Sequence, residues 1–256
     1  GKPSIITTTS LTNDATPTIE GIAEAGSTVE LFNGDVSLGT TTADGTTGAY
    51  AITPAELDDG AYSLTVTATD AAGNISAASD TLSMTVDATA PAQPAITTTT
   101  TLTNNATPTI EGTAEAGSTV TLLSGGVAIA TETANGDGQF SITTSTLADS
   151  NYALTVTATD AAGNISDASS ALNLTVDTTA PAQPSITTTT SLTNDSTPTI
   201  EGIAEAGSTV TLFVDGVTTG ITTTADGTTG AYTITPAELD DGTYALTVTA
   251  EDAAGN

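Results

Sequence analysis

The sequence predicts an all-β protein made of three tandem β-sandwiches arranged end to end as an elongated rod. The first observation is an internal repeat of about 90 residues, because residues 16–21 return at 107–112 and again at 197–202. The second is the alternation of apolar and polar residues over short stretches, which is typical of half-buried strands. The third is a turn signal roughly every 8 to 12 residues, as in β-sandwiches.

The repeat divides the chain into modules at residues 1–87, 88–177 and 178–256. Two connectors, residues 86–94 and 176–184, join them. Each connector has an Asp at the end of an alternating run, followed by prolines that fix φ and bias the preceding residue toward extended backbone. The third module has no counterpart of residues 165–177, so we expect it to lack its last strand and to expose an unpaired edge.

Seven strands are expected in module one, with counterparts in the other modules. They lie at residues 3–11, 17–23, 28–32, 37–42, 49–53, 62–69 and 82–86. The first is rich in Thr and β-branched residues, and the next two alternate Ile19, Val29 and Leu31 with polar neighbours. The dipeptide Asn33-Gly34 is a strong hairpin signal, so it predicts the tight turn into the fourth strand.

The last three strands of module one have the clearest alternation. Tyr50 and Ile52 share one face of the fifth strand. In the sixth strand, apolar residues from Tyr62 to Ala68 alternate with Ser and Thr without a break, and the seventh repeats this pattern up to Val86. No segment of the chain has a convincing helical period.

Strands that run alternately up and down assign the loops of each sandwich to its two ends. In module one, the turns at Glu24 and Asp70 share the end that holds the amino terminus, whereas Asp87 lies at the opposite end. Consequently, the connector Asp of one module points at the Glu and Asp turns of the next module.

Composition excludes several classes of function. The chain has no Cys, no His and one basic residue, Lys2, so it cannot form disulfides, His-based catalytic triads or His and Cys zinc sites. Its net charge of −29 disfavours binding to nucleic acid, and no apolar run is long enough for membrane insertion. The charge either attracts cations or only keeps a long surface protein soluble.

Three acidic positions recur and are expected to meet at the junctions between modules. The expected clusters are Asp87, Glu115 and Asp160 at the first junction, and Asp177, Glu205 and Asp252 at the second. Two carboxylates about 5 Å apart repel by roughly 3 kcal/mol at an effective dielectric near 20, and no basic side chain is nearby. A hard cation such as Ca²⁺ would offset this repulsion, with Asn164 or Asn256, turn carbonyls and water completing its oxygen shell.

A purely structural interpretation of the same residues remains open. An Asp at the start of a turn often accepts hydrogen bonds from its own backbone, and the Gly73-Asn74 pair supplies positive φ. Likewise, the Thr runs at 97–101 and 187–190 either form a hydroxyl array that binds ice or glycans, or simply reflect β-propensity. A glycosidase is disfavoured because the chain has no Trp and only 3% aromatic residues, so sugar-stacking groups are scarce.

The ordered motifs resemble those of bacterial immunoglobulin-like tandem domains. They are EGxAEAGSTV at 20–29, 111–120 and 201–210, TATDAAGN at 67–74 and 157–164, and VDTTAP at 176–181. Such domains form the stalks of giant, calcium-dependent surface adhesins of the RTX type, which type I secretion often exports and which act in biofilms.

The resemblance implies an immunoglobulin-like sandwich, a non-enzymatic extender role and a location on the bacterial cell surface. It also implies Ca²⁺ at the module junctions, held by the six carboxylates named above. Glu24 and Asp70 of module one have no preceding connector Asp, so this site would be empty or half-liganded, and Glu251 adds a carboxylate beside Asp252. We therefore expect a monomeric rod whose partners are its own neighbouring repeats. The alternative is a module for homophilic adhesion or for binding a glycan, ice or a protein.

Overall fold

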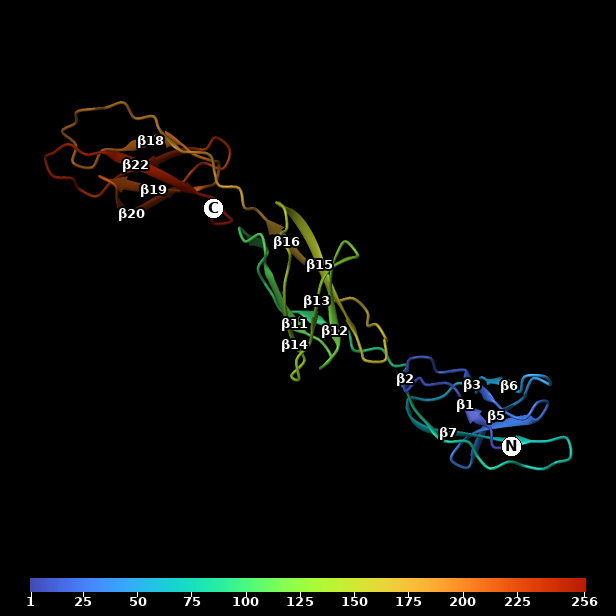
Figure 1. Ribbon diagram of the computed structural model, residues 1–256. Coiled ribbons are helices and arrows are strands. Elements are labelled where there is room, and N and C mark those ends of the chain that lie inside the picture. Colours follow the sequence, from blue (N-terminus) through green and yellow to red (C-terminus); the bar gives the residue numbers. More distant parts are fainter.

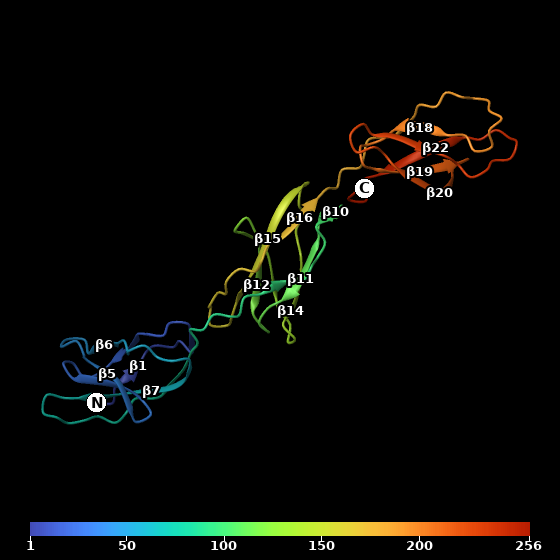
Figure 2. The ribbon, with the colours of Figure 1, turned by 180° about the vertical axis from the view of Figure 1, so that it is seen from behind.

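A computed structural model describes residues 1–256 as three β-sandwich modules that follow one another along an elongated molecule (Figure 1). The middle module is inclined to both of its neighbours, as the view from behind also shows (Figure 2). Each module encloses its own hydrophobic core. No helix with the length and apolarity needed to cross a membrane occurs in the structure.

Module two shows the complete arrangement of strands. They are β9 (Ala95–Ile96), β10 (Leu102–Thr103), β11 (Thr109–Thr113), β12 (Thr119–Ser124), β13 (Val127–Thr133), β14 (Gln139–Thr143), β15 (Ser150–Thr159) and β16 (Leu172–Val176). The larger sheet has the order β10-β16-β15-β12-β13, and the smaller sheet has the order β14-β11-β9. Every pair is antiparallel except β10 with β16, which is parallel.

The core of module two lies between the inner faces of these sheets. Val120, Leu122, Leu154 and Val156 come from the larger sheet and are completely buried, as the alternation predicts. Burial of one such side chain stabilises the fold by roughly 1.5–3 kcal/mol. On the smaller sheet, Phe140 lies across a glycine of β11, and a Cβ on that glycine would lie 2.3 Å from the ring. Packing therefore requires glycine at this position.

Module one repeats this topology. Its strands are β1 (Ser4–Ile5), β2 (Leu11–Thr12), β3 (Ile19–Ile22), β4 (Thr28–Asn33), β5 (Val36–Thr42), β6 (Ala49–Ile52), β7 (Gly60–Thr69) and β8 (Leu82–Val86). The expected single strand at residues 3–11 is wrong, because β1 and β2 belong to different sheets. Thr7 Oγ1 accepts the N–H of Glu20, at 2.8 Å, so a side chain replaces the main chain and ends the β1–β3 ladder.

The hairpin between β4 and β5 also differs from the prediction. Its two central residues are Gly34 and Asp35, and only Gly34 has a positive φ, of 59°. Asn33 is instead the last residue of β4, where its Oδ1 accepts the N–H of Ser63 at 3.0 Å. The Asn-Gly signal therefore found the hairpin but was one residue out of register.

Module three has a smaller sheet system. Its strands are β17 (Ser185–Ile186), β18 (Ile200–Ile203), β19 (Thr209–Val214), β20 (Val217–Thr224), β21 (Ala231–Ile234) and β22 (Leu246–Glu251). In module two, β10 pairs with β16. Residues 192–193 are the counterpart of β10 in module three, but no strand follows β22, so they have no strand to pair with. As a result, Leu192 is 90% exposed, whereas Leu102 is 36% exposed. Leu246 and Val248 are also only half-buried.

Thr144 provides a test of the packing in module two. It is 4% exposed and its hydroxyl has no hydrogen-bond partner, although its N–H donates to Pro108 O at 3.1 Å. The other modules have proline at this position. Because a buried hydroxyl without a partner is unfavourable, we expect Thr144→Val to stabilise module two by about 1–2 kcal/mol, measured by urea unfolding followed through its NMR signals.

The matched control is Thr143→Val on the neighbouring residue. Thr143 is exposed, and its hydroxyl shares a 2.9 Å hydrogen bond with that of Thr109. This substitution should leave stability unchanged or lower it slightly. If Thr144→Val destabilised the module more than Thr143→Val did, the result would show that the Thr144 hydroxyl makes a hydrogen bond, and the prediction would be wrong.

Candidate functional site

The first junction is held by an asparagine at the end of the turn after β15. Asn164 Nδ2 donates to the main-chain oxygen of Asp87, at 2.7 Å, and to Oδ2 of Asp160, at 2.8 Å. Asp87 directly follows β8, and its N–H donates to Thr12 O at 2.9 Å, so module one fixes the position of its carbonyl. The Asn164 amide therefore ties the last residue of module one to a turn of module two.

The second junction repeats these contacts. Asn256 Nδ2 donates to Asp177 O at 2.7 Å and to Asp252 Oδ2 at 2.9 Å. The Asp177 N–H donates to Thr103 O at 2.9 Å. The repetition shows that the junction is a property of the repeat.

The turn itself explains why the asparagine lies where it does. Asp160 Oδ1 accepts the N–H groups of Gly163, at 2.7 Å, and Asn164, at 2.9 Å. Gly163 has a φ of 97°, in the left-handed region that glycine adopts without strain. These bonds close the turn and fix the asparagine beside its own aspartate.

The preceding module also holds each connector through an aspartate in the turn before its long strand. Asp149 accepts the N–H and hydroxyl of Thr178, at 2.9 and 2.7 Å, and the hydroxyl of Thr179, at 2.6 Å. At the first connector, Asp59 accepts the Ala88 N–H at 2.7 Å and the hydroxyl of Thr89. We call Asp59 and Asp149 the connector clasps.

Further amides join the modules. Asn104 Nδ2 donates to Gly255 O at 2.8 Å, across the second junction. At the first junction the corresponding amide nitrogen, that of Asn13, lies beside Gly163. Within module two, Gln93 of the first connector donates to Ala168 O at 2.6 Å, which holds the connector on this module. Polar side-chain groups therefore line both junctions.

Hydrogen bonds keep the turn carboxylates ionised. Burial of Asp160 by itself raises its pKa, but hydrogen bonds from the side chain and main chain of Asn164 outweigh this effect and hold the pKa below its usual value. The pKa of Asp252 is lowered by the main-chain and side-chain hydrogen bonds of Asn256. At neutral pH these groups are carboxylates, the form that a cation binds.

The structure brings together only part of each expected cation site. Asp160 and Asn164 meet the Asp87 main chain, and Asp252 and Asn256 meet the Asp177 main chain. Nowhere do three or more Asp or Glu side chains gather closely enough to hold a metal ion. The remaining expected ligands, Glu115 and Glu205, are exposed and their side chains accept no hydrogen bond. The metal site therefore stays a prediction.

The available donor atoms nevertheless suit a hard cation. They are carboxylate, amide and main-chain oxygens, the ligands that Ca²⁺ prefers. In module one, Glu24, Asp70 and Asn74 line a small pocket, into which the amino terminus projects and donates to Glu24 Oε2 at 3.1 Å.

Sequence reasoning missed two sets of junction residues. The connector clasps looked like ordinary turn residues, and only their recurrence at the same place before the long strand could have identified them. Asn13 and Asn104 also recur, and the up-and-down order of the strands places the Asn13 turn at the same end of module one as Asp87, but the residue type alone does not indicate a contact with the next module.

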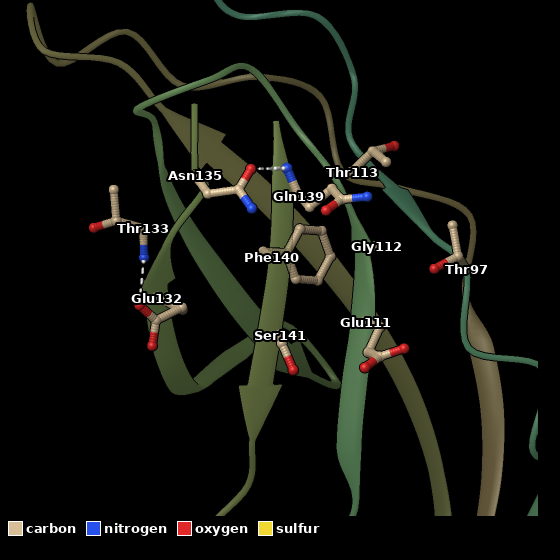
Figure 3. Close-up of a pocket in the computed structure, with 10 residues that line it drawn as sticks. All are labelled: Thr97, Glu111, Gly112, Thr113, Glu132, Thr133, Asn135, Gln139, Phe140 and Ser141. Atoms are coloured by element: carbon tan, nitrogen blue, oxygen red, sulfur yellow. Dashed lines mark hydrogen bonds between the residues drawn. The ribbon is translucent and has the colours of Figure 1, made fainter. Parts of the chain in front are cut away.

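A second feature is a shallow polar groove in module two. It has a volume of about 460 Å³ and is lined by residues of β11, β13 and β14 (Figure 3). Glu111 and Glu132 lie on opposite sides of it, and Asn135 Oδ1 accepts the Gln139 N–H at 2.9 Å. Module three has a similar groove of about 540 Å³. Asn135 Oδ1 is already occupied by this hydrogen bond within the loop. The polar side chains that line the groove therefore do not converge on a single point where a ligand could bind.

The fold and the repeated junctions define a class of protein: tandem immunoglobulin-like β-sandwich repeats. The bacterial Ig-like domain family matches residues 5–88, 92–178 and 182–256. The chain belongs to this family. The all-β fold and the family expected from the sequence motifs are thereby confirmed. No curated protein was found to be similar to the chain.

Several solved structures are similar to parts or all of the chain. Fibronectin(III)-like modules of Clostridium thermocellum CbhA are 19% identical, over 68% of this chain and 93% of theirs, with a TM-score of 0.46. The BSP domain of a biofilm associated protein is 22% identical, over 70% of this chain and 30% of its own, with a TM-score of 0.29. A marsupial T cell receptor is 10% identical, over 98% and 99% of the two chains, with a TM-score of 0.48.

The Asp149 clasp predicts how the connector depends on pH. Hydrogen bonds from the side chains of Thr179 and Thr178, and from the Thr178 main chain, lower the Asp149 pKa. A lowered pKa stabilises the native state above the unfolded value of about 3.9, and this stabilisation is lost as the pH falls through the folded value. We therefore expect Asp149→Asn to reduce protection of the Thr178 amide from hydrogen exchange at pH 7.

The difference between Asp149→Asn and the unmodified protein should begin to shrink below about pH 4 and should vanish as the pH falls through the lowered pKa of folded Asp149, because the wild-type carboxyl then becomes protonated and neutral. Asp137→Asn is a charge-matched control in a loop that does not touch the connector, and it should leave Thr178 protection unchanged. Equal protection of Thr178 in the wild type and Asp149→Asn at pH 7 would show that the clasp does not hold the connector.

Proposed function

We propose that the chain is a non-enzymatic extender segment of a bacterial cell-surface adhesin, in which Ca²⁺ bound at the junctions stiffens the stalk. The observation that carries the proposal is the repeated junction. At both module boundaries, an Asp main-chain oxygen fixed by one module meets an Asp–Asn pair fixed by the next. A segment whose function is to extend an adhesin away from the cell surface needs the same connection at every module boundary.

Membership of the bacterial Ig-like domain family supports this role, since Ig-like domains are typically structural modules. The strongly negative charge and the lack of disulfides suit an extracellular chain that gains stability from packing and from cations. In this proposal the chain is a monomeric rod, its partners are its neighbouring repeats, and it binds neither nucleic acid nor a membrane.

The proposed cation ligands are the residues of each junction. At the first junction they are Asp87, Glu115, Asp160 and Asn164, and at the second they are Asp177, Glu205, Asp252 and Asn256. When bound, Ca²⁺ would neutralise carboxylates from two modules at once. The chain's own part is to present those oxygens: the Asp-Ala-Ala-Gly-Asn turn fixes two of them, and the connector brings the third. An affinity of roughly 10⁻⁴–10⁻³ M would suit extracellular calcium.

The proposal predicts that calcium narrows the range of angles at the first junction. The chain has no cysteine, so spin labels can be attached at Thr40→Cys and Ser141→Cys, exposed positions on β5 and β14. The distribution of distances between them, measured by electron–electron resonance, should narrow on adding calcium and broaden again with chelator. Asp87→Asn should raise the calcium concentration at the midpoint by about tenfold, because ligand charge sets affinity.

Glu111→Gln is the charge-matched control, since Glu111 is exposed on β11 and takes no part in the junction. It should leave the calcium midpoint unchanged. A distance distribution that is the same with calcium and with chelator would refute stiffening by calcium. Specific binding on a glycan array, together with that result, would favour the alternative role as a ligand-binding module.

A further inference from the structure

The same asparagine occurs in all three modules, and two copies cross a junction. Asn164 and Asn256 each bridge their own turn aspartate and the main chain of the preceding connector. Asn74, in module one, donates only to Asp70 Oδ2, at 2.8 Å. Asn74 is exposed, whereas Asn164 and Asn256 are half-buried. The bridge is therefore present at both turns that meet a connector in the structure.

The asparagine is positioned before any docking takes place. In module one, the Asn74 N–H donates to Asp70 Oδ1 at 2.9 Å, and the Asp70 N–H donates back to Asn74 O at 3.1 Å. Asn164 and Asp160 make the same pair of bonds, at 2.9 and 3.1 Å. The turn thus presents one amide hydrogen outward at no further conformational cost, which favours binding to a connector carbonyl.

We infer that each junction has two alternative bridges: the asparagine amide when no cation is bound, and the cation when it is. Asn164 Nδ2 stands within 2.8 Å of both Asp87 O and Asp160 Oδ2, which lie in different modules. A cation that coordinates both oxygens, at Ca²⁺–O distances of about 2.3–2.6 Å, would compete with this N–H₂ group for the same two oxygens. We therefore expect one bridge to displace the other.

The carboxamide can serve both states because its two ends are nearly isosteric. One end carries two donors and the other carries an acceptor oxygen. Turning it about its last bond exchanges them, and this terminal torsion is broad. In the amide state the nitrogen joins the two oxygens; in the cation state the Asn164 oxygen becomes a third ligand. Only this second half of the inference rests on the calcium-binding function proposed above.

The amide bridge makes Asn164 a positioning residue of the junction in the absence of calcium. The bridge should keep the two modules partly aligned at low calcium. The carboxylates of Glu115 and Glu205 are exposed and take no part in it. Loss of a hydrogen bond worth about 1 kcal/mol raises the ratio of open to docked junctions about fivefold. The junction would then have three states. Without either bridge the modules pivot freely, with the amide bridge their motion is restrained, and with the cation bound they are held firmly.

The test uses the full chain with labels at Thr40→Cys and Ser141→Cys. In chelator, Asn164→Asp and Asn164→Ala should both raise the population of open junctions about fivefold relative to the wild type. In calcium, Asn164→Asp should return to the wild-type distribution, because it keeps an oxygen ligand, whereas Asn164→Ala should recover less. Asn74→Asp is the matched control: it changes the same turn where no connector docks, and it should alter neither distribution.

A second measurement follows the amide directly. The side-chain NH₂ signals of Asn164 should shift during a calcium titration, whereas those of Asn74 should shift much less, and the same spectra report whether each variant is folded. If the open population in chelator is unchanged by both Asn164 variants, the amide bridge is refuted. If calcium narrows the distribution without moving the Asn164 NH₂ signals, displacement of one bridge by the other is refuted. A chain that does not respond to calcium, but opens in Asn164→Ala, would retain the amide bridge and refute calcium binding.

Discussion

The constraint on which this molecule depends is the need to satisfy main-chain polar groups where the chain leaves one sandwich and enters the next. Within a sheet the neighbouring strand provides partners, but a connector with several prolines cannot form a ladder. Here the partners are side chains from both sides. Asp149 takes the N–H of Thr178, and Asn256 donates to the carbonyl of Asp177. Hydrogen bonds to backbone atoms thus hold the connector on both sides of each junction.

This arrangement also explains much of the acidic composition. Asp44 accepts the N–H groups of Thr46 and Thr47 and the Thr47 hydroxyl, and Asp226 does the same in module three. These bonds lower the pKa of both carboxyls, so each keeps its charge to a lower pH than a free Asp side chain does. Many carboxylates of the chain therefore already accept hydrogen bonds that stabilise loops of the fold. Any cation that binds competes with, or adds to, hydrogen bonds that already exist.

The fold could be predicted from the sequence further than the site could. Period-two alternation placed Leu64, Val66 and Ala68 in the core, because the side-chain direction of a strand is a local property. The split of the first strand and the register of the hairpin at Gly34 depend on individual side chains, such as the hydroxyl of Thr7, that enter a ladder from outside. The junction was located from strand counting, and Asp160 and Asn164 were identified there. Their actual partner, the backbone of Asp87, could not be identified, because backbone atoms carry no sequence signal.

The two junctions join successive modules through the same amide and the same clasp. When one rigid body is placed on the next by a constant rotation and translation, repetition generates a screw. A long array of such modules would consequently be a superhelix whose contour length grows linearly with the number of repeats. The inclination of the middle module in Figure 1 is then one step of that screw. A slight change in the step, made at every boundary at once, would alter the end-to-end distance of the whole array far more than any single hinge could.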